Sequence, residues 1–231
     1  MSQAHELDVF ACGLDGVNQI EASAGTGKTW NICALYVRLL LEKRLTVEQI
    51  LVVTFTKAAT AELHERIRDR LVGVMQVLDT ALVQLAEALV DSSGDSSGDS
   101  AGDSAANLEA GEADVLAQLA AEGHDLAEWL DMPALTRGDP FLERLFATVI
   151  GFEPHHVIGM GEARLRLQHA VRGFDQAAIH TIHAFCQRAL QEAPFAAGLP
   201  FEFELATDDR ALRFETAAEF WRTQVEPLAA R

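Results

Sequence analysis

The 231-residue sequence has no apolar run near the ~20 residues that a helix needs to cross a bilayer. Its start carries Glu6 and Asp8, whereas a secretory leader has basic residues followed by an apolar stretch. The three cysteines form no CxxC pair and show no metal-ligand spacing; they are Cys12, Cys33 and Cys186. These absences predict a cytoplasmic protein without leader or membrane span, whose free thiols are buried.

Lysine is scarce, and acidic residues outnumber basic ones. The sequence contains only Lys28, Lys43 and Lys57, and its net charge is −17. A negative charge alone argues against nucleic-acid binding, which favours basic surfaces. However, residues 73–170 hold 17 acidic and only 4 basic side chains, so most of the acidity lies in the middle of the chain. The two ends could therefore still present a locally basic groove.

The order of predicted elements at the start of the chain is that of an α/β nucleotide-binding domain. A short strand at residues 18–22 leads to a glycine-rich loop, and apolar spacing predicts a helix over residues 28–43. The β-branched and apolar run at residues 50–55 predicts a strand of a parallel sheet, followed by a helix over residues 58–75. This order is the βαβ arrangement.

The middle of the chain follows a different pattern. Residues 77–170 show helical periodicity and no strand signal. The helical pattern is interrupted by the repeated Asp-Ser-Ser-Gly tract at residues 91–106. Because Gly, Ser and Asp cannot bury apolar area, this tract is predicted to be a disordered acidic linker. A last strand is expected at residues 178–181, and helices are expected over residues 183–191 and 208–225.

The glycine-rich loop carries the strongest chemical signal. It is close to the pattern G-x-x-x-x-G-K-[ST], with alanine at the first glycine position. Its residues are Ala22, Ser23, Ala24, Gly25, Thr26, Gly27, Lys28 and Thr29. In such loops the backbone N–H groups and the start of the following helix bind phosphates, a lysine reaches the β- and γ-phosphates of ATP, and a hydroxyl binds Mg²⁺. These last roles fall to Lys28 and Thr29; the alternative is a glycine-rich turn with an incidental Gly-Lys-Thr.

Three segments resemble motifs of one helicase family, in the same order along the chain. Residues 20–29 are similar to the phosphate loop of UvrD/Rep-type helicases, in the form found in RecB-type subunits of exodeoxyribonuclease V complexes. Residues 52–63 resemble motif Ia of that family, and residues 179–188 resemble its next DNA-contacting motif. The resemblance implies contacts to single-stranded DNA from Thr54, Phe55, Thr56, Lys57, Thr181 and His183.

The same residues, taken without the family, leave alternatives open. Phe55 follows a predicted parallel strand, at the edge where ligands bind in α/β folds, and could stack on a base or belong to the core. Thr54 and Thr56 could bond phosphates or simply favour the strand. His183 could contact DNA or merely start a helix, and Trp221 on its apolar helical face is expected in the core.

One part of a helicase motor is not found in the sequence. ATP hydrolysis needs a carboxylate that holds Mg²⁺ and a residue that orients water. The resemblance places both in an Asp-Glu-x-x-Asp motif after an apolar strand, and neither Asp208 nor Asp209 follows such a strand. We therefore expect an N-terminal part of a larger enzyme that is inactive in ATP hydrolysis by itself.

These observations predict an α/β fold: a RecA-like P-loop NTPase parallel sheet with an all-helical insertion. Residues 1–75 and 171–231 would form the ATP-binding domain, and residues 76–170 the insertion. The resemblance implies an ATP-dependent DNA helicase and exonuclease subunit of double-strand break repair by recombination. It would use ATP and Mg²⁺ on single-stranded and duplex DNA, with RecC-like and RecD-like subunits as partners. The alternatives are a stand-alone UvrD-like helicase and a nucleotide- and DNA-binding module without catalysis.

Overall fold

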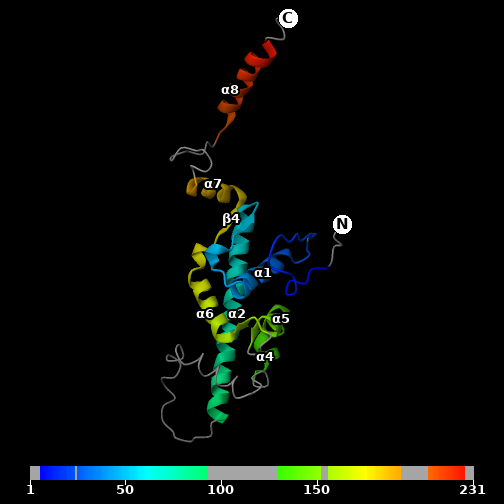
Figure 1. Cartoon of the computed structure of the whole chain (residues 1–231), viewed down its shortest axis with the longest axis vertical. Helices are drawn as coiled ribbons and strands as arrows, with labels where there is room; N and C mark the ends of the chain where they lie inside the picture. Colours follow the sequence, from blue (N-terminus) through cyan, green and yellow to red (C-terminus); the bar gives the residue numbers. More distant parts are fainter. Residues whose placement is uncertain (1–5, 24, 93–129, 152–155, 194–207, 227–231) are drawn as a thin grey trace. The chain divides into compact units, whose positions relative to one another are not determined.

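The structure is a computed structural model that describes most of the chain (Figure 1). The described residues are 6–23, 25–92, 130–151, 156–193 and 208–226. They form two units, of which one ends at Ile182 and the other begins at His183. The predicted acidic linker at 91–106 lies outside the described residues, except for its first two positions.

Helices make up most of the first unit. They are α1 (Lys28–Glu42), α2 (Lys57–Ser92), α4 (Met132–Thr136), α5 (Pro140–Thr148) and α6 (Met160–Arg172). Two 3₁₀ turns accompany them, η1 (Val47–Gln49) and η2 (Phe174–Gln176). The strands are β1 (Val52–Thr54), β2 (Ile150–Gly151), β3 (Ile158–Gly159) and β4 (Ile179–Thr181).

The core of the first unit lies where α1 and α6 pack against α2 (Figure 1). Residues of α2 at intervals of three or four are fully buried, as an amphipathic helix requires. These residues are Ile67, Leu71, Val74 and Leu78. Each such side chain contributes about 1.5–3 kcal/mol through burial. The packing of α2 therefore determines the position of the residues at its start, from Lys57 onward.

The strands expected at residues 50–55 and 178–181 are present as β1 and β4. They pair in parallel, with Val52 opposite Ile179 and Thr54 opposite Thr181. The carboxyl ends of both strands thus meet at one edge. The parallel pairing confirms the α/β character of the fold, although this sheet has only two strands among the described residues.

The strand predicted at residues 18–22 is absent, and this prediction is wrong. The segment has no regular structure, and Ile20 is 44% exposed. No described strand lies beside it. A strand needs a neighbour to satisfy its backbone groups, so propensity alone does not create one.

The helix expected at residues 58–75 and the start of the helical pattern at residues 77–170 form one continuous helix, α2. Gly73 is the only helix-weakening residue near the expected break, and one internal glycine costs only about 1 kcal/mol relative to alanine. Because α2 packs against α1 and α6 and has buried residues on both sides of this point, the core holds the helix together. The division of the chain at residue 75 therefore falls within a helix.

The expectation of an all-helical insertion at residues 76–170 is also wrong. The strands β2 and β3 lie within it and pair in parallel, with Ile150 opposite Ile158. Both isoleucines are buried. A strand of two residues is too short to show the alternation by which strands are recognised in a sequence.

The second unit contains α7 from His183 onward, α8 (Arg210–Phe220) and the π-helical turn η3 (Trp221–Val225). The helix α7 (Ile182–Glu192) confirms the helix expected at residues 183–191. Trp221 is 62% exposed, so its assignment to the core is wrong. An apolar helical face has the same sequence pattern whether or not another element covers it.

The cysteines are free, but only Cys33 is buried, whereas Cys12 is half-buried and Cys186 is exposed. The prediction of buried thiols therefore holds for one residue of three. No helix in the described part of the chain is both long and apolar enough to cross a membrane.

Candidate functional site

The backbone of the glycine-rich loop is left-handed at two of its glycines. Gly25 has φ of 80°, and Gly27, which precedes the first residue of α1, has φ of 75°. An added Cβ at either position would meet no atom within 4 Å. The left-handed backbone, rather than crowding, therefore requires glycine at both positions. Ala24 lies outside the described residues.

The start of α1 is open to an anion. α1 begins at Lys28, directly after the loop, and no side chain caps its first turn. Its leading backbone N–H groups and its dipole thus remain available to a phosphate. The loop itself is closed by Thr26, whose Oγ1 donates to Ser23 O at 2.8 Å.

The two predicted catalytic side chains stand at the entrance of this site. Lys28 is exposed and pairs with no described residue, so its ammonium group is free to meet a phosphate. Thr29 is half-buried. No group of three His, Cys, Asp or Glu residues in the described chain could hold a metal ion. The residue predicted to bind Mg²⁺ through its hydroxyl, Thr29, lies in the first turn of α1.

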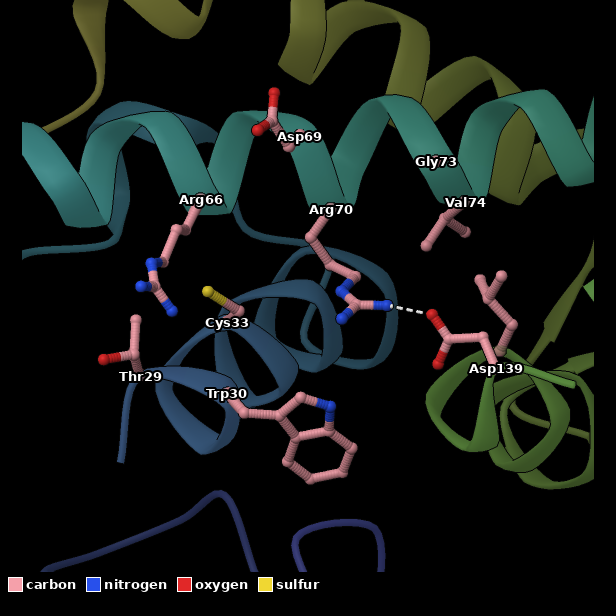
Figure 2. Close-up of a pocket in the computed structure, with 10 residues that line it drawn as sticks. Thr29, Trp30, Cys33, Arg66, Asp69, Arg70, Gly73, Val74 and Asp139 are labelled. Carbon is pink, nitrogen blue, oxygen red and sulfur yellow. Dashed lines mark hydrogen bonds and ion pairs between the residues drawn. The ribbon is translucent and has the colours of Figure 1, made fainter. Parts of the chain in front are cut away.

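A pocket of about 400 Å³ lies beside the loop, on the side of α1 that faces α2 (Figure 2). Its walls are the first two turns of α1, the middle of α2 and the start of α5. Thr29 and Arg66 are at one end in the view of Figure 2, and Asp139 is at the other. Arg70 donates to Asp139 Oδ2 at 2.6 Å and joins α2 to α5. No sequence pattern indicated this pocket, because its walls come from three separate helices.

The threonines of motif Ia form a hydrogen-bonded turn at the end of β1. Thr56 caps α2, since its Oγ1 accepts from Ala59 N at 3.1 Å. Thr60 Oγ1 donates to Thr56 O at 3.0 Å and lies 2.7 Å from Thr54 Oγ1. The threonines therefore shape the turn, and Thr60 is a member that the sequence analysis missed. Thr60 could have been found from its position in the sequence, because it lies one helical turn after the capping residue Thr56.

Phe55 is held outward by this turn. Its side chain is 86% exposed, so the alternative that Phe55 belongs to the core does not hold in the described structure. Lys57 is also exposed, at the first turn of α2, where a positive charge opposes the helix dipole. It pairs with no described residue. Neither side chain stabilises the fold in an evident way, and both are available to a ligand.

Pairing of β1 and β4 adds one more predicted residue to this edge. Thr181 is half-buried and lies opposite Thr54, the residue that precedes Phe55 in the chain. His183 belongs to the second unit and is exposed. The structure thus brings together the predicted DNA-contacting residues of the first unit at one edge of the sheet.

Asp208 and Asp209 were the residues considered for the Asp-Glu-x-x-Asp motif, and in the structure both form ion pairs with arginines. They lie at the start of α8 and pair with Arg210 and Arg213, at 3.1 Å and 2.7 Å respectively. The hydrogen bond from the Arg210 side chain lowers the pKa of Asp208. Carboxylates at the start of a helix are stabilised there by its dipole.

The chain is similar in sequence to several proteins named RecBCD enzyme subunit RecB. The RecBCD enzyme subunit RecB of Escherichia coli (strain K12) is 34% identical over 235 residues, which cover 97% of this chain and 14% of that protein. The same subunit of Haemophilus influenzae is 33% identical over 99% of this chain and 15% of that protein. That of Buchnera aphidicola subsp. Schizaphis graminum is 51% identical over 71 residues, 27% of this chain and 6% of that protein.

The chain thus spans about one seventh of the length of the first two of these relatives. The sequence model of one family, the UvrD/REP helicase N-terminal domain, matches residues 3–229. Because this match covers nearly every residue, including the loop, both motif strands and α8, the chain belongs to the UvrD/REP helicase N-terminal domain family.

Proposed function

We propose that this chain is the N-terminal ATP- and single-stranded-DNA-binding part of an ATP-dependent DNA helicase and exonuclease subunit. The subunit acts in double-strand break repair by recombination, in the cytoplasm, together with RecC-like and RecD-like subunits. The similarity to proteins named RecBCD enzyme subunit RecB supports the proposal. One structural observation carries it: a loop with two left-handed glycines leads into an uncapped helix whose first residue is an unpaired lysine.

Residues 22–29 bind the phosphates of ATP in this proposal. Backbone N–H groups at the start of α1 donate to phosphate oxygens, and Lys28 neutralises charge at the β- and γ-phosphates. The Thr29 hydroxyl is a ligand of Mg²⁺, which supplies charge neutralisation between the phosphates when it is bound. The division into a nucleotide-binding domain, at residues 1–75 and 171–231, and an insertion belongs to the same proposal.

The edge formed by β1 and β4 binds single-stranded DNA. Phe55 stacks on a base, and Lys57 attracts the phosphate backbone. Thr54 and Thr56 place these two side chains, while Thr181 and His183 contribute from the next motif. Aromatic stacking is tolerant of sequence because every base has a π-face, so binding of a strand of any sequence is expected.

The 231-residue chain itself provides the test. Binding of a fluorescent ATP analogue and of a labelled single-stranded oligonucleotide is measured by anisotropy, at low and high salt. We expect saturable binding of both, with DNA binding that weakens as salt is raised, because charge screening and ion release act on the Lys57 contact. A folded chain that binds neither ligand would contradict the proposal.

A further inference from the structure

The pocket beside the loop contains two arginines, Arg66 and Arg70, one helical turn apart on α2 (Figure 2). Both face α1, and in Figure 2 the guanidinium group of Arg66 points toward Thr29, whereas that of Arg70 points toward Asp139. Thr29 is the residue expected to hold Mg²⁺ between the β- and γ-phosphates. The pocket therefore places a positive charge near the expected position of the terminal phosphate.

The side chain of Arg70 makes contacts that stabilise the fold. It donates to Asp139 Oδ2 at 2.6 Å, and its guanidinium carbon lies 4.5 Å from the centroid of the Phe141 ring. Its side chain is 24% exposed. The ion pair neutralises the charge of Asp139, and the stacking fixes the plane of the guanidinium group. Arg70 thus joins α2 to α5 and has little freedom to meet a ligand.

Arg66 is held much less firmly. Its partner is Glu62 on the same helix, at 2.7 Å, and the two side chains are 57% and 54% exposed. An exposed pair of this kind contributes between about 0 and 1 kcal/mol, so a better acceptor can displace the carboxylate. A phosphate oxygen is such an acceptor, because arginine and phosphate form charge-assisted and often paired hydrogen bonds.

The acidic residues that line the described pocket are Asp69 and Asp139, and Asp139 is paired with Arg70 at the end away from Thr29. Figure 2 shows Asp69 on the far side of α2, pointing away from α1. The thiol of Cys33 lies between the two helices, and its burial raises its pKa although Arg70 and Arg66 oppose the rise. The thiol therefore remains uncharged at neutral pH, and the positive charge of Arg66 is not offset by it.

We propose that Arg66 is a second cationic ligand of the nucleotide, directed at its terminal phosphate from the opposite side of the loop to Lys28. This inference rests on the proposed ATP binding at residues 22–29. Arg66 lies on the helix whose first turn follows Phe55 and Thr56, and buried residues of α2 recur from Leu63 to Leu85. A triphosphate that draws Arg66 toward Thr29 therefore pulls on the same element that carries the DNA-contacting turn.

If Arg66 contacts the terminal phosphate, its loss should weaken binding of a nucleoside triphosphate more than binding of ADP. If Arg66 only supports the loop, both affinities should fall equally. Arg66→Gln removes the charge while keeping a long polar side chain, and the affinities of ATPγS and ADP are measured by calorimetry. We expect ATPγS to bind about tenfold more weakly, as for the loss of one charge-assisted hydrogen bond. ADP affinity should change by less than about twofold, because ADP lacks that phosphate. Arg66→Lys should recover part of the difference.

Arg68 provides a matched control. It is exposed on the same helix, two residues away, and does not line the pocket. Arg68→Gln should leave both affinities unchanged. Equal weakening of ATPγS and ADP in Arg66→Gln, or no weakening, would overturn the role of Arg66 while leaving nucleotide binding established. Failure of the unaltered chain to bind either nucleotide would instead overturn the proposed function, and this inference with it.

Discussion

The hydroxyl groups of Thr54 and Thr60 lie 2.7 Å apart, across the turn that holds Phe55 in solvent. Thr54 closes the strand β1, and Thr60 lies in the first turn of α2. This contact is therefore a link between the sheet and the helix that carries Arg66. It makes the turn between them a defined structure rather than a loose connection.

Removal of this link should loosen the turn. In Thr60→Val the side chain keeps its shape, but the bonds to Thr54 Oγ1 and Thr56 O are lost. We expect the free energy of unfolding to fall by about 1–2 kcal/mol and the affinity for single-stranded DNA to fall severalfold. Urea denaturation and anisotropy measure the two effects. Thr60→Ser restores the hydroxyl and should restore DNA binding; a Val variant with unaltered DNA affinity would show that the link has no positioning role.

Phe55→Ala should separate binding from stability. The ring is 86% exposed, so the free energy of unfolding should change by less than about 0.5 kcal/mol. Loss of base stacking should weaken single-stranded DNA binding by about 1–3 kcal/mol. Phe214→Ala is the control, because Phe214 is 78% exposed on α8 in the second unit. If both variants weakened binding equally, the effect would not be specific to Phe55.

Substitution of alanine for Gly27 and for Gly73 should change the free energy of unfolding in opposite directions. Gly27 has φ of 75°, and Gly27→Ala should destabilise the chain by about 1–2 kcal/mol and weaken nucleotide binding. Gly73 lies within α2 with an ordinary φ and no atom within 4 Å of an added Cβ. Gly73→Ala should stabilise the chain by about 0.5–1 kcal/mol. Thermal or urea denaturation checks both signs; a neutral Gly27→Ala would mean that the loop does not need its left-handed residue.

Lys28→Ala should abolish most nucleotide binding without unfolding the chain. Lys28 is exposed and pairs with no described residue, so nothing in the fold depends on it. Calorimetric titration with ATPγS and with ADP should show loss of both, unlike the selective loss expected for Arg66→Gln. The control is Lys43→Ala, because Lys43 lies just beyond α1 and pairs with Asp15 at 2.7 Å. Unchanged nucleotide affinity in folded Lys28→Ala would contradict the phosphate-loop assignment.

The sequence by itself determined the local features of the site. The glycine-rich pattern predicted a loop that includes Gly25 and Gly27, both of which have positive φ in the structure. Apolar spacing predicted a helix from Lys28, which the structure confirms. The β-branched run at residues 50–55 predicted β1, and the short strand expected at residues 178–181 is present as β4. These features depend on backbone preferences and periodicity over a few residues, which are properties of the sequence itself.

Only the tertiary structure decided which of these segments meet and which side chains remain free. Residues 18–22 form no strand because a strand depends on a neighbour, and α2 stays unbroken because α1 and α6 pack against it. Phe55 lies in a turn where hydrogen bonds link Thr54 and Thr56 to Thr60. The position of Arg66 beside Thr29 follows from the packing of α2 on α1. Such relations join residues far apart in the chain, and their energies come from contacts that no local pattern records.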